Sequence, residues 1–107
     1  MKLQVLHVLD CPNAAVLAAR LKEVLTGRPD VLVEQRVIRD AGEAAAQGMT
    51  GSPTLLVDGV DPFQVAGLSP GISCRLYRDE DGATSGAPSL AALRTALNSA
   101  PEPADAG

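Results

Sequence analysis

The chain has 107 residues, a length typical of one domain, and its 46% hydrophobic content is enough for a core without disulfides or metals. Its net charge of −4 and its lack of a basic run argue against nucleic acid as a partner, and Phe63 and Tyr77 are too few aromatic residues for base stacking. No apolar run reaches the roughly 18 residues of a membrane span, so we expect no membrane partner.

The N-terminal segment predicts a buried strand. Residues 3–9 (LQVLHVL) are almost continuously apolar, which is typical of a strand buried on both faces of a parallel or mixed sheet. No cleavage pattern of a signal peptide follows this run, and two cysteines cannot make a disulfide framework. We therefore expect a cytoplasmic protein in a reducing compartment, where thiols stay free.

The apolar period changes after this strand. From Pro12 to Thr26 the apolar residues recur every three or four positions, which predicts an amphipathic helix with Pro12 in its first turn and Gly27 at its end. Residues 31–38 (VLVEQRVI) then resume a β-branched alternation. A strand, a helix and a strand at this spacing predict a parallel crossover.

The middle of the chain predicts a short helix, a strand and a long loop. Asp40 with Glu43 has the spacing of a capping box, and Gly48 is placed to end the helix between them. Residues 54–57 predict a strand, because Gly-Ser-Pro precedes them and an Asp-Gly turn signal follows. Residues 60–71 carry two prolines and two glycines, so we expect an ordered loop without regular structure.

The C-terminal part predicts a half-buried strand and a helix. Residues 72–78 alternate, with Ile72, Cys74 and Leu76 on the face expected to be buried. The acidic cluster at 79–81 predicts a solvated turn. The following helix places three leucines on one stripe: Leu90, Leu93 and Leu97. Residues 99–107 are polar and predict a disordered tail, which leaves a domain over residues 1–98.

The element order β-α-β-α-β-β-α predicts an α/β fold with three helices and a four-stranded mixed sheet. We expect residues 3–9 at the centre of the sheet, paired in parallel with residues 31–38. Residues 54–57 are expected to pair antiparallel with residues 72–78.

Several segments resemble the thioredoxin superfamily. A cysteine directly follows the first strand in CPNA (11–14), GSPT (51–54) stands where the family has its cis-proline loop, and two strands and a helix follow. The chain is similar to small bacterial single-cysteine members of this superfamily. Its DGVDPF and SCRLY segments are similar to thioredoxin-like proteins that carry an alkylmercury lyase label. The resemblance implies a thioredoxin-like fold and a cis bond before Pro53.

The resemblance also implies a site around Cys11. A thiol at a helix N-terminus faces backbone amides that favour the thiolate, whereas the neighbouring Asp10 opposes it. The alternative is a structural cysteine that caps the helix. By the resemblance Cys11 is the catalytic thiol, and the following residues bind substrate: Pro12, Asn13, Ser52, Pro53 and Thr54.

The expected activity is thiol-disulfide exchange by a monothiol redox protein whose partners are small thiols or protein disulfides. Ala14 stands where dithiol enzymes of the family have their second cysteine, so a general disulfide reductase is not expected. Cys74 is expected to be a small core residue, with a resolving thiol for Cys11 as the alternative. His7 is expected in the core or on a sheet face, because about 13 Å of strand separates it from Cys11.

Two other functions remain open at this point. The same groove, or loop 60–71, could hold a partner in a non-catalytic binding module. Alternatively, Cys11 and Cys74 could handle a soft metal such as mercury, since thiolates select soft ions. The chain has no Cys-x-x-Cys, no His-x-x-x-His and no glycine-rich phosphate loop, so no resident metal and no cofactor are expected. The oligomeric state stays open.

Overall fold

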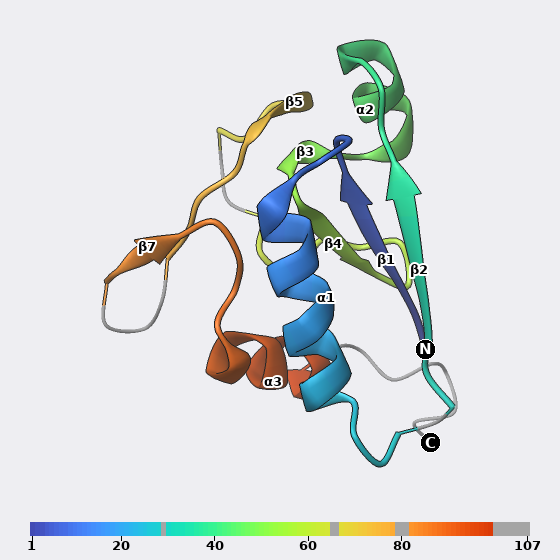
Figure 1. The fold of residues 1–107 in the computed structure, drawn as a ribbon, viewed down its shortest axis with the longest axis vertical. Coiled ribbons are helices and arrows are strands. Elements are labelled where there is room, and N and C mark those ends of the chain that lie inside the picture. The colour runs from blue at the N-terminus through green and yellow to red at the C-terminus, as the bar shows by residue number, and fades with distance from the viewer. Residues whose placement is uncertain (29, 65–66, 79–81, 100–107) are drawn as a thin grey trace.

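The computed structural model describes residues 1–28, 30–64, 67–78 and 82–99. Its central element is β1 (Lys2–His7), the middle strand of a three-stranded sheet with the order β2-β1-β4 (Figure 1). β2 (Leu32–Val37) pairs with β1 in parallel, as predicted. β4 (Thr54–Val57) pairs with the other edge of β1 in the antiparallel direction. The sheet is therefore mixed.

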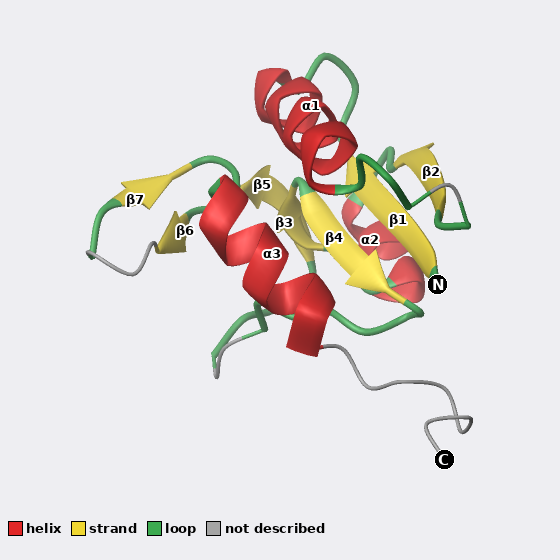
Figure 2. Ribbon diagram, turned by 90° about the horizontal axis from the view of Figure 1, so that it is seen from below, coloured by secondary structure: helices red, strands yellow, loops and turns green. Residues whose placement is uncertain are grey.

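The helices of the described residues cover both faces of this sheet. α1 (Pro12–Val24) and α3 (Leu90–Ser99) lie on one face, and α2 (Ala41–Gln47) lies on the other (Figure 2). This arrangement is a mixed α/β fold, as predicted. None of these helices has both the length and the apolar character needed to cross a membrane.

The alternation of side chains along β1 produces two separate cores. Leu3 and Val5 point toward α1 and α3, whereas Leu6 points toward α2. The first core also contains residues of both helices, of β4 and of the segment just before α3: Leu17, Leu21, Leu55, Val57, Ala87, Leu93 and Leu97. The second, smaller core adds Ile38, Ala44, Met49 and Leu56. Because β1 and β4 each contribute to both cores, these two strands hold the two layers together.

Local sequence signals set the ends of the first two helices. α1 begins at Pro12, as predicted, and ends at Val24, followed by a turn through Gly27 with φ of +85°. At α2, Asp40 Oδ1 accepts a hydrogen bond from Glu43 N at 2.7 Å. Gly48 ends α2 in the left-handed region with φ of +86°. The predicted cap and stop of the short helix are thus confirmed.

The strands after β4 differ from the prediction. β5 (Gly71–Cys74) pairs in parallel with β3 (Thr50–Ser52), and β6 (Tyr77–Arg78) pairs antiparallel with β7 (Thr84–Ser85). The expected antiparallel pairing of 54–57 with 72–78 is wrong, and the central sheet has three strands. The reason is that the chain is held at the start of β3 where β5 begins, and not beside β4. Hydrogen bonds from Gly71 N to the Met49 carbonyl and from Arg75 N to the Ser52 carbonyl, both 3.1 Å, fix this position.

The buried face of residues 72–78 is also the opposite of the predicted one. Cys74 is exposed, so its interpretation as a small core residue is wrong. Ile72 and Leu76 are exposed with it, and Arg75 and Tyr77 are buried instead. The physical reason is that Arg75 and Tyr77 find polar partners in the interior, which are described below.

The loop before β5 begins with the predicted Asp-Gly turn. Asp58 and Gly59 have φ of +49° and +85°, and Val57 and Val60 form a bridge across them. Beyond Val60, the described part of this loop contains no helix or strand, as predicted. The acidic cluster at 79–81 and nearly all of the predicted tail, from residue 100 onward, lie outside the described residues.

Candidate functional site

Cys11 is the N-cap residue of α1. Its backbone is extended, with φ of −79° and ψ of 111°, and its carbonyl accepts a hydrogen bond from Ala14 N at 3.1 Å. The Cys11 side chain makes no capping hydrogen bond, and the residue is half-buried. Asp10 has φ of +59°, a turn that Asp tolerates better than most residues and that leads the chain sharply from β1 into α1. The thiol therefore stands at the start of the helix with its sulfur uncommitted to the cap.

A side-chain hydrogen bond joins the cysteine turn to the segment around Pro53. Ser52 Oγ accepts a hydrogen bond from Val8 N at 3.0 Å, just beyond the last residue of β1. The Ser52–Pro53 peptide bond is cis, as predicted. Ser52 and Pro53 are almost completely buried. This contact brings the two segments that the sequence singled out, which are some 40 positions apart, into one part of the molecule.

Thr54, the third residue expected in the binding segment, uses its hydroxyl inside the protein. Thr54 Oγ1 donates to the Gly51 carbonyl at 2.6 Å and accepts a hydrogen bond from Thr50 N at 3.2 Å. The side chain is fully buried. These bonds hold the turn at 50–54 in shape, so Thr54 orients the Ser52–Pro53 segment by supporting it from within.

Asn13 lies in the first turn of α1 against the segment that enters α3. A Cβ atom on Gly86 would overlap the Asn13 carboxamide unless that side chain moved, so the two residues lie in close contact. Arg20 Nη1 donates to the carbonyls of Ala87 and Pro88, at 3.2 and 2.8 Å, and fixes the same segment along α1. The 86–88 segment therefore forms one wall beside the start of the helix, while Pro12 stays exposed.

Tyr77 is a buried phenol that bonds the Pro53 segment. Its hydroxyl donates a hydrogen bond to the Pro53 carbonyl. Burial raises the pKa of the Tyr77 phenol, the Arg75 guanidinium opposes this rise, and the negative charges of Asp61 and Cys11 add to it.

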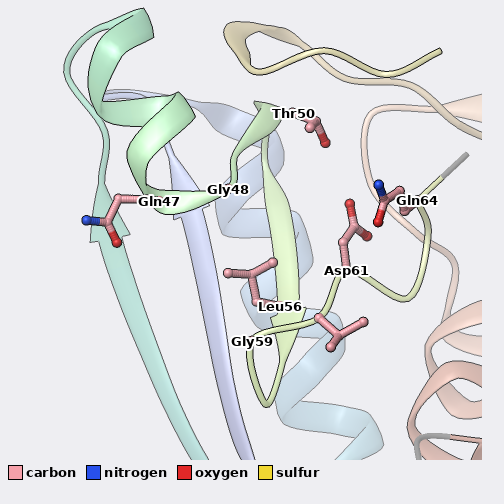
Figure 3. A pocket seen from close by; sticks show the side chains of 8 residues that line it. Gln47, Gly48, Thr50, Leu56, Gly59, Asp61 and Gln64 are labelled. Atoms are coloured by element: carbon pink, nitrogen blue, oxygen red, sulfur yellow. The ribbon is translucent and has the colours of Figure 1, made fainter. Parts of the chain in front are cut away.

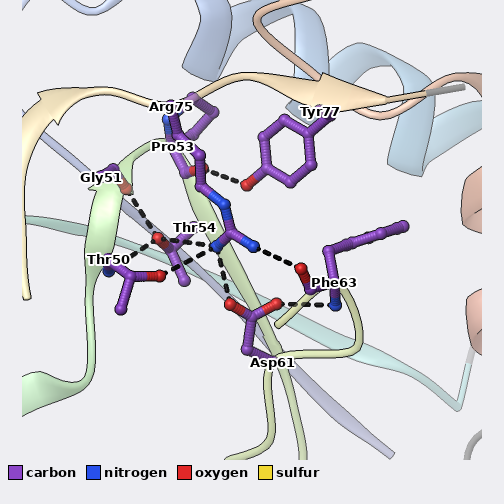
Figure 4. A network of polar contacts seen from close by, with 8 residues as sticks. All are labelled: Thr50, Gly51, Pro53, Thr54, Asp61, Phe63, Arg75 and Tyr77. Carbon is purple, nitrogen blue, oxygen red and sulfur yellow. Dashed lines mark hydrogen bonds and ion pairs between the residues drawn. The ribbon is translucent and has the colours of Figure 1, made fainter. Parts of the chain in front are cut away.

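Arg75 is the centre of a buried polar network (Figure 4). Nη1 forms an ion pair with Asp61 Oδ2 at 2.6 Å, and Nη2 donates to the Phe63 carbonyl at 2.8 Å. The guanidinium carbon lies 4.6 Å from the centre of the Tyr77 ring. Nη1 also approaches the hydroxyls of Thr50 at 3.1 Å and Thr54 at 3.4 Å. The buried charge is therefore paired and hydrogen-bonded, as a stable interior requires.

Close backbone packing supports this network at Gly51. Gly51 has φ of +108°, and a Cβ atom there would lie 2.8 Å from Arg75 Cβ. Phe63 packs edge-on against Tyr77, with 5.4 Å between the ring centres. The loop over 58–70 thus contributes both an ion-pair partner and an aromatic contact to the interior.

Cys74 lies opposite Ser52 in the β3–β5 pairing. It is exposed, and both cysteines are free thiols. Because Ser52 also bonds Val8, β5 runs beside the segment that faces the cysteine turn. A resolving thiol at position 74 thus remains an alternative, although no bond joins it to Cys11 in this structure.

A cavity of about 340 Å³ lies between the end of α2, β3 and the turn after β4 (Figure 3). Its polar lining includes Gln47, Thr50, Asp61 and Gln64. None of the residues predicted to bind substrate lines it. The carboxylate of Asp61 is already paired with Arg75. This cavity is accordingly separate from the thiol site.

The remaining sequence candidates do not join the thiol site. His7 is half-buried at the end of β1, and its Nδ1 donates to the Val8 carbonyl at 2.9 Å. In the part of the chain that the structure describes, no group of three or more His, Cys, Asp or Glu residues is arranged to hold a metal. Sequence reasoning missed Tyr77 and Gly86. No local pattern marks either residue, since their contacts are with segments distant along the chain.

No family model, curated protein or solved structure matches this chain. A function must therefore come from its own residues. Of these, the uncapped Cys11 thiol, in the turn that Val8 ties to Ser52, is the group with the clearest chemistry.

Proposed function

We propose that this protein is a monothiol redox protein with a thioredoxin-like fold, in which Cys11 carries out thiol-disulfide exchange. The observation that carries the proposal is the position of Cys11 at the N-terminus of α1, half-buried and without a capping bond. Helix N-termini are positions at which cysteine thiols commonly act as nucleophiles toward disulfides.

The arrangement around Cys11 supports the same chemistry. The hydrogen bond from Val8 N to Ser52 Oγ ties the Pro53 segment to the turn that carries the thiol. Pro12 and Asn13 border the thiol on the helix side, and Ser52 and Pro53 would border it on the other. Because Ser52 and Pro53 are almost completely buried and their carbonyls already accept hydrogen bonds from Arg75 N and the Tyr77 hydroxyl, they would support the thiol site from within rather than contact a bound disulfide.

The proposed reaction has two exchange steps. The Cys11 thiolate attacks one sulfur of a substrate disulfide, forms a mixed disulfide and releases the other sulfur as a thiolate. A low-molecular-weight thiol, as its thiolate, then attacks the substrate sulfur of the mixed disulfide and releases Cys11 as a thiolate. The substrate sulfur leaves joined to the small thiol, so the external thiol supplies the electrons and no cofactor takes part.

The residue at position 14 determines how the reaction can end. Ala14 is buried and carries no thiol, so no cysteine one helical turn away can expel the bound group. The mixed disulfide on Cys11 is therefore expected to persist until an external thiol arrives.

Treatment with oxidised glutathione, followed by intact-mass and peptide-mass analysis, tests the proposal. We expect one stable adduct on Cys11 in the wild type, no adduct at position 11 in Cys11→Ser, and an adduct on Cys11 in Cys74→Ser. Reduced glutathione should remove it. Each cysteine variant is the matched control for the other, because both proteins keep one free thiol.

Two results would contradict this assignment. An adduct on Cys74 together with an unmodified Cys11 would exclude Cys11 as the redox thiol and leave the non-catalytic binding module. Rapid loss of the adduct with a Cys11–Cys74 crosslink would instead identify Cys74 as a resolving thiol, and the protein would then not be monothiol.

A further inference from the structure

β2 forms an open edge of the central sheet. Its one strand neighbour among the described residues is β1, and the other side of β2 is unpaired (Figure 1). Leu32 N donates to the Met1 carbonyl at 3.2 Å and Ile38 N donates to the His7 carbonyl at 2.7 Å. Since backbone groups alternate along a strand, the N–H and C=O groups of the odd-numbered residues face outward. These residues are Val33, Gln35 and Val37.

Half of the side chains of β2 are apolar and exposed, although the strand also carries Glu34, Gln35 and Arg36. Leu32 is 69% exposed, Val33 is 45% exposed and Val37 is 39% exposed. Edge strands of stable monomers usually carry inward-pointing charges, prolines or bulges that prevent pairing. β2 contains no proline, and it has no bulge, because its register with β1 runs without interruption over all six residues. This edge is therefore suited to receive another strand.

The charges on β2 select the partner. Glu34 and Arg36 lie on one face of the strand, with 3.5 Å between Glu34 Oε1 and Arg36 Nη2. If a second copy of β2 runs antiparallel with the two-fold axis at Gln35, Glu34 lies opposite the partner's Arg36, and Arg36 lies opposite the partner's Glu34. In the same register Val33 lies opposite the partner's Val37. The strand is thus complementary to itself in charge and in apolar contact.

Shifting the axis by one position on either side removes this match. The outward backbone groups allow an axis at Glu34 or at Arg36, because odd-numbered residues then still face odd-numbered residues. The first shift places Glu34 opposite the partner's Glu34, and the second places Arg36 opposite the partner's Arg36. Like charges directly opposite are destabilising. The axis at Gln35 is therefore the favoured register.

We propose that two copies of this chain associate through the free edge of β2, as antiparallel strands related by a two-fold axis at Gln35. The two three-stranded sheets then form one continuous six-stranded sheet. The pairs formed by Val33, Gln35 and Val37 exchange the backbone hydrogen bonds, and the Glu34–Arg36 pairs flank the axis. The interface is isologous, so it closes at the dimer and does not extend into a fibre.

Charge exchange at the two flanking positions tests the dimer and its register. Sedimentation velocity over a concentration series should show a monomer–dimer equilibrium for the wild type. Glu34→Arg and Arg36→Glu should each weaken self-association by roughly tenfold or more, because each places two pairs of like charges across the axis. A mixture of the two variants should restore the dimer as a heterodimer, since every flanking pair then has opposite charges.

Controls separate this effect from net charge and from misfolding. Glu23→Arg and Lys22→Glu make the same charge changes at exposed positions of α1 and should leave the equilibrium unchanged. Recovery of the heterodimer on mixing shows that both variants are folded. In a Cys11→Ser/Cys74→Ser background, Gln35→Cys should form an intermolecular disulfide on oxidation, because hydrogen-bonded antiparallel pairs have Cα atoms about 5.5 Å apart. Lys22→Cys in that background should not.

Three results would overturn the proposal. A wild-type protein that stays monomeric up to its solubility limit would exclude the dimer. A dimer that persists in both charge variants, or that fails to re-form on mixing them, would exclude this register.

Discussion

Arg75 and Asp61 form an ion pair of 2.6 Å in which the two side chains are only 3% and 8% exposed. The pair connects the loop after β4 to the segment between β5 and β6, and Arg75 continues the network to Phe63 and Tyr77. Burying a charge is favourable only while its partner remains, so this contact determines how the C-terminal strands are held against the sheet.

Asp61→Ala should destabilise the protein strongly, because it leaves the Arg75 guanidinium buried without its counter-charge. We expect a loss of about 3 to 5 kcal/mol in the free energy of unfolding, measured by urea denaturation. The double variant Asp61→Leu/Arg75→Met should be more stable than Asp61→Ala, since it removes both charges. Arg94→Met, at an exposed arginine of α3, should change stability by less than about 1 kcal/mol. Equal losses at positions 61 and 94 would contradict the buried pair.

The titration of Tyr77 should be displaced to high pH. Burial raises its pKa, Arg75 opposes the rise, and Asp61 and Cys11 add to it. It is the chain's one tyrosine and there is no tryptophan, so tyrosinate absorbance follows this group alone. In the folded protein the phenol should stay protonated above pH ~10, and Cys11→Ser should bring its pKa down. A native titration at the value seen in urea would contradict the buried position.

The same shift makes stability depend on pH in one direction. Because the pKa of Tyr77 is higher in the folded state, the unfolded chain releases the proton first as pH rises. The stability that this group contributes is complete below pH ~10 and is lost as pH rises through the folded-state value. Urea denaturation of wild type and Tyr77→Phe across this range should show a steeper loss in the wild type.

Gly86→Ala should destabilise the protein, because the new methyl group overlaps the Asn13 carboxamide. We expect a loss below the range of about 1 to 3 kcal/mol that holds for overpacked core sites, because the overlapping atoms are the end of a side chain that can rotate. In an Asn13→Ala background the same change should cost less, since the overlapping atoms are absent. Gly71→Ala is the matched control, because a Cβ atom there meets open space. Additive effects of the changes at 13 and 86 would show that the two residues do not touch.

Ser52→Ala should loosen the end of β1. The substitution removes the acceptor of the Val8 amide, so hydrogen exchange at Val8 should accelerate, and stability should fall by about 1 to 3 kcal/mol. NMR-detected exchange of the Val8 amide measures the local effect. Ser73→Ala, at an exposed serine of β5, provides the comparison and should leave Val8 unchanged.

Ala14→Cys should convert the proposed monothiol protein into a dithiol protein. Ala14 is one helical turn from Cys11, a separation that a disulfide can span. Oxidation should then give an intramolecular bond, seen by intact mass, and the glutathione adduct on Cys11 should become short-lived. A persistent adduct in Ala14→Cys would show that position 14 does not face the thiol.

The parts of the fold that depend on neighbouring residues could be predicted from the sequence. The apolar period, Pro12 and Gly27 placed α1, and the Asp40 cap and Gly48 placed α2. The parallel pairing of β1 with β2 followed from the short helical crossover between them. In each case the signal and the structure it produces lie within a few residues or one crossover.

The features that sequence reasoning missed depend on distant partners. Alternation over 72–78 predicted two faces, but which face is buried was decided by Asp61 and Phe63, which give Arg75 its partners inside the protein. The β3–β5 pairing depends on the path of a long loop, for which no local pattern exists. At the candidate site, the Cys11 position was predicted, whereas the contact of Gly86 with Asn13 was not, because it joins two ends of the chain.

The order of the elements along the chain has a consequence for synthesis on the ribosome. All three strands of the central sheet are complete by Val57, whereas α3, which covers Leu17 and Leu21 of α1, begins only at Leu90. A nascent chain can therefore assemble its sheet while the part of the apolar side of α1 that α3 covers still faces water. Translation products that stop before α3 would keep that surface uncovered, and they are the ones that chaperones and proteases should recognise.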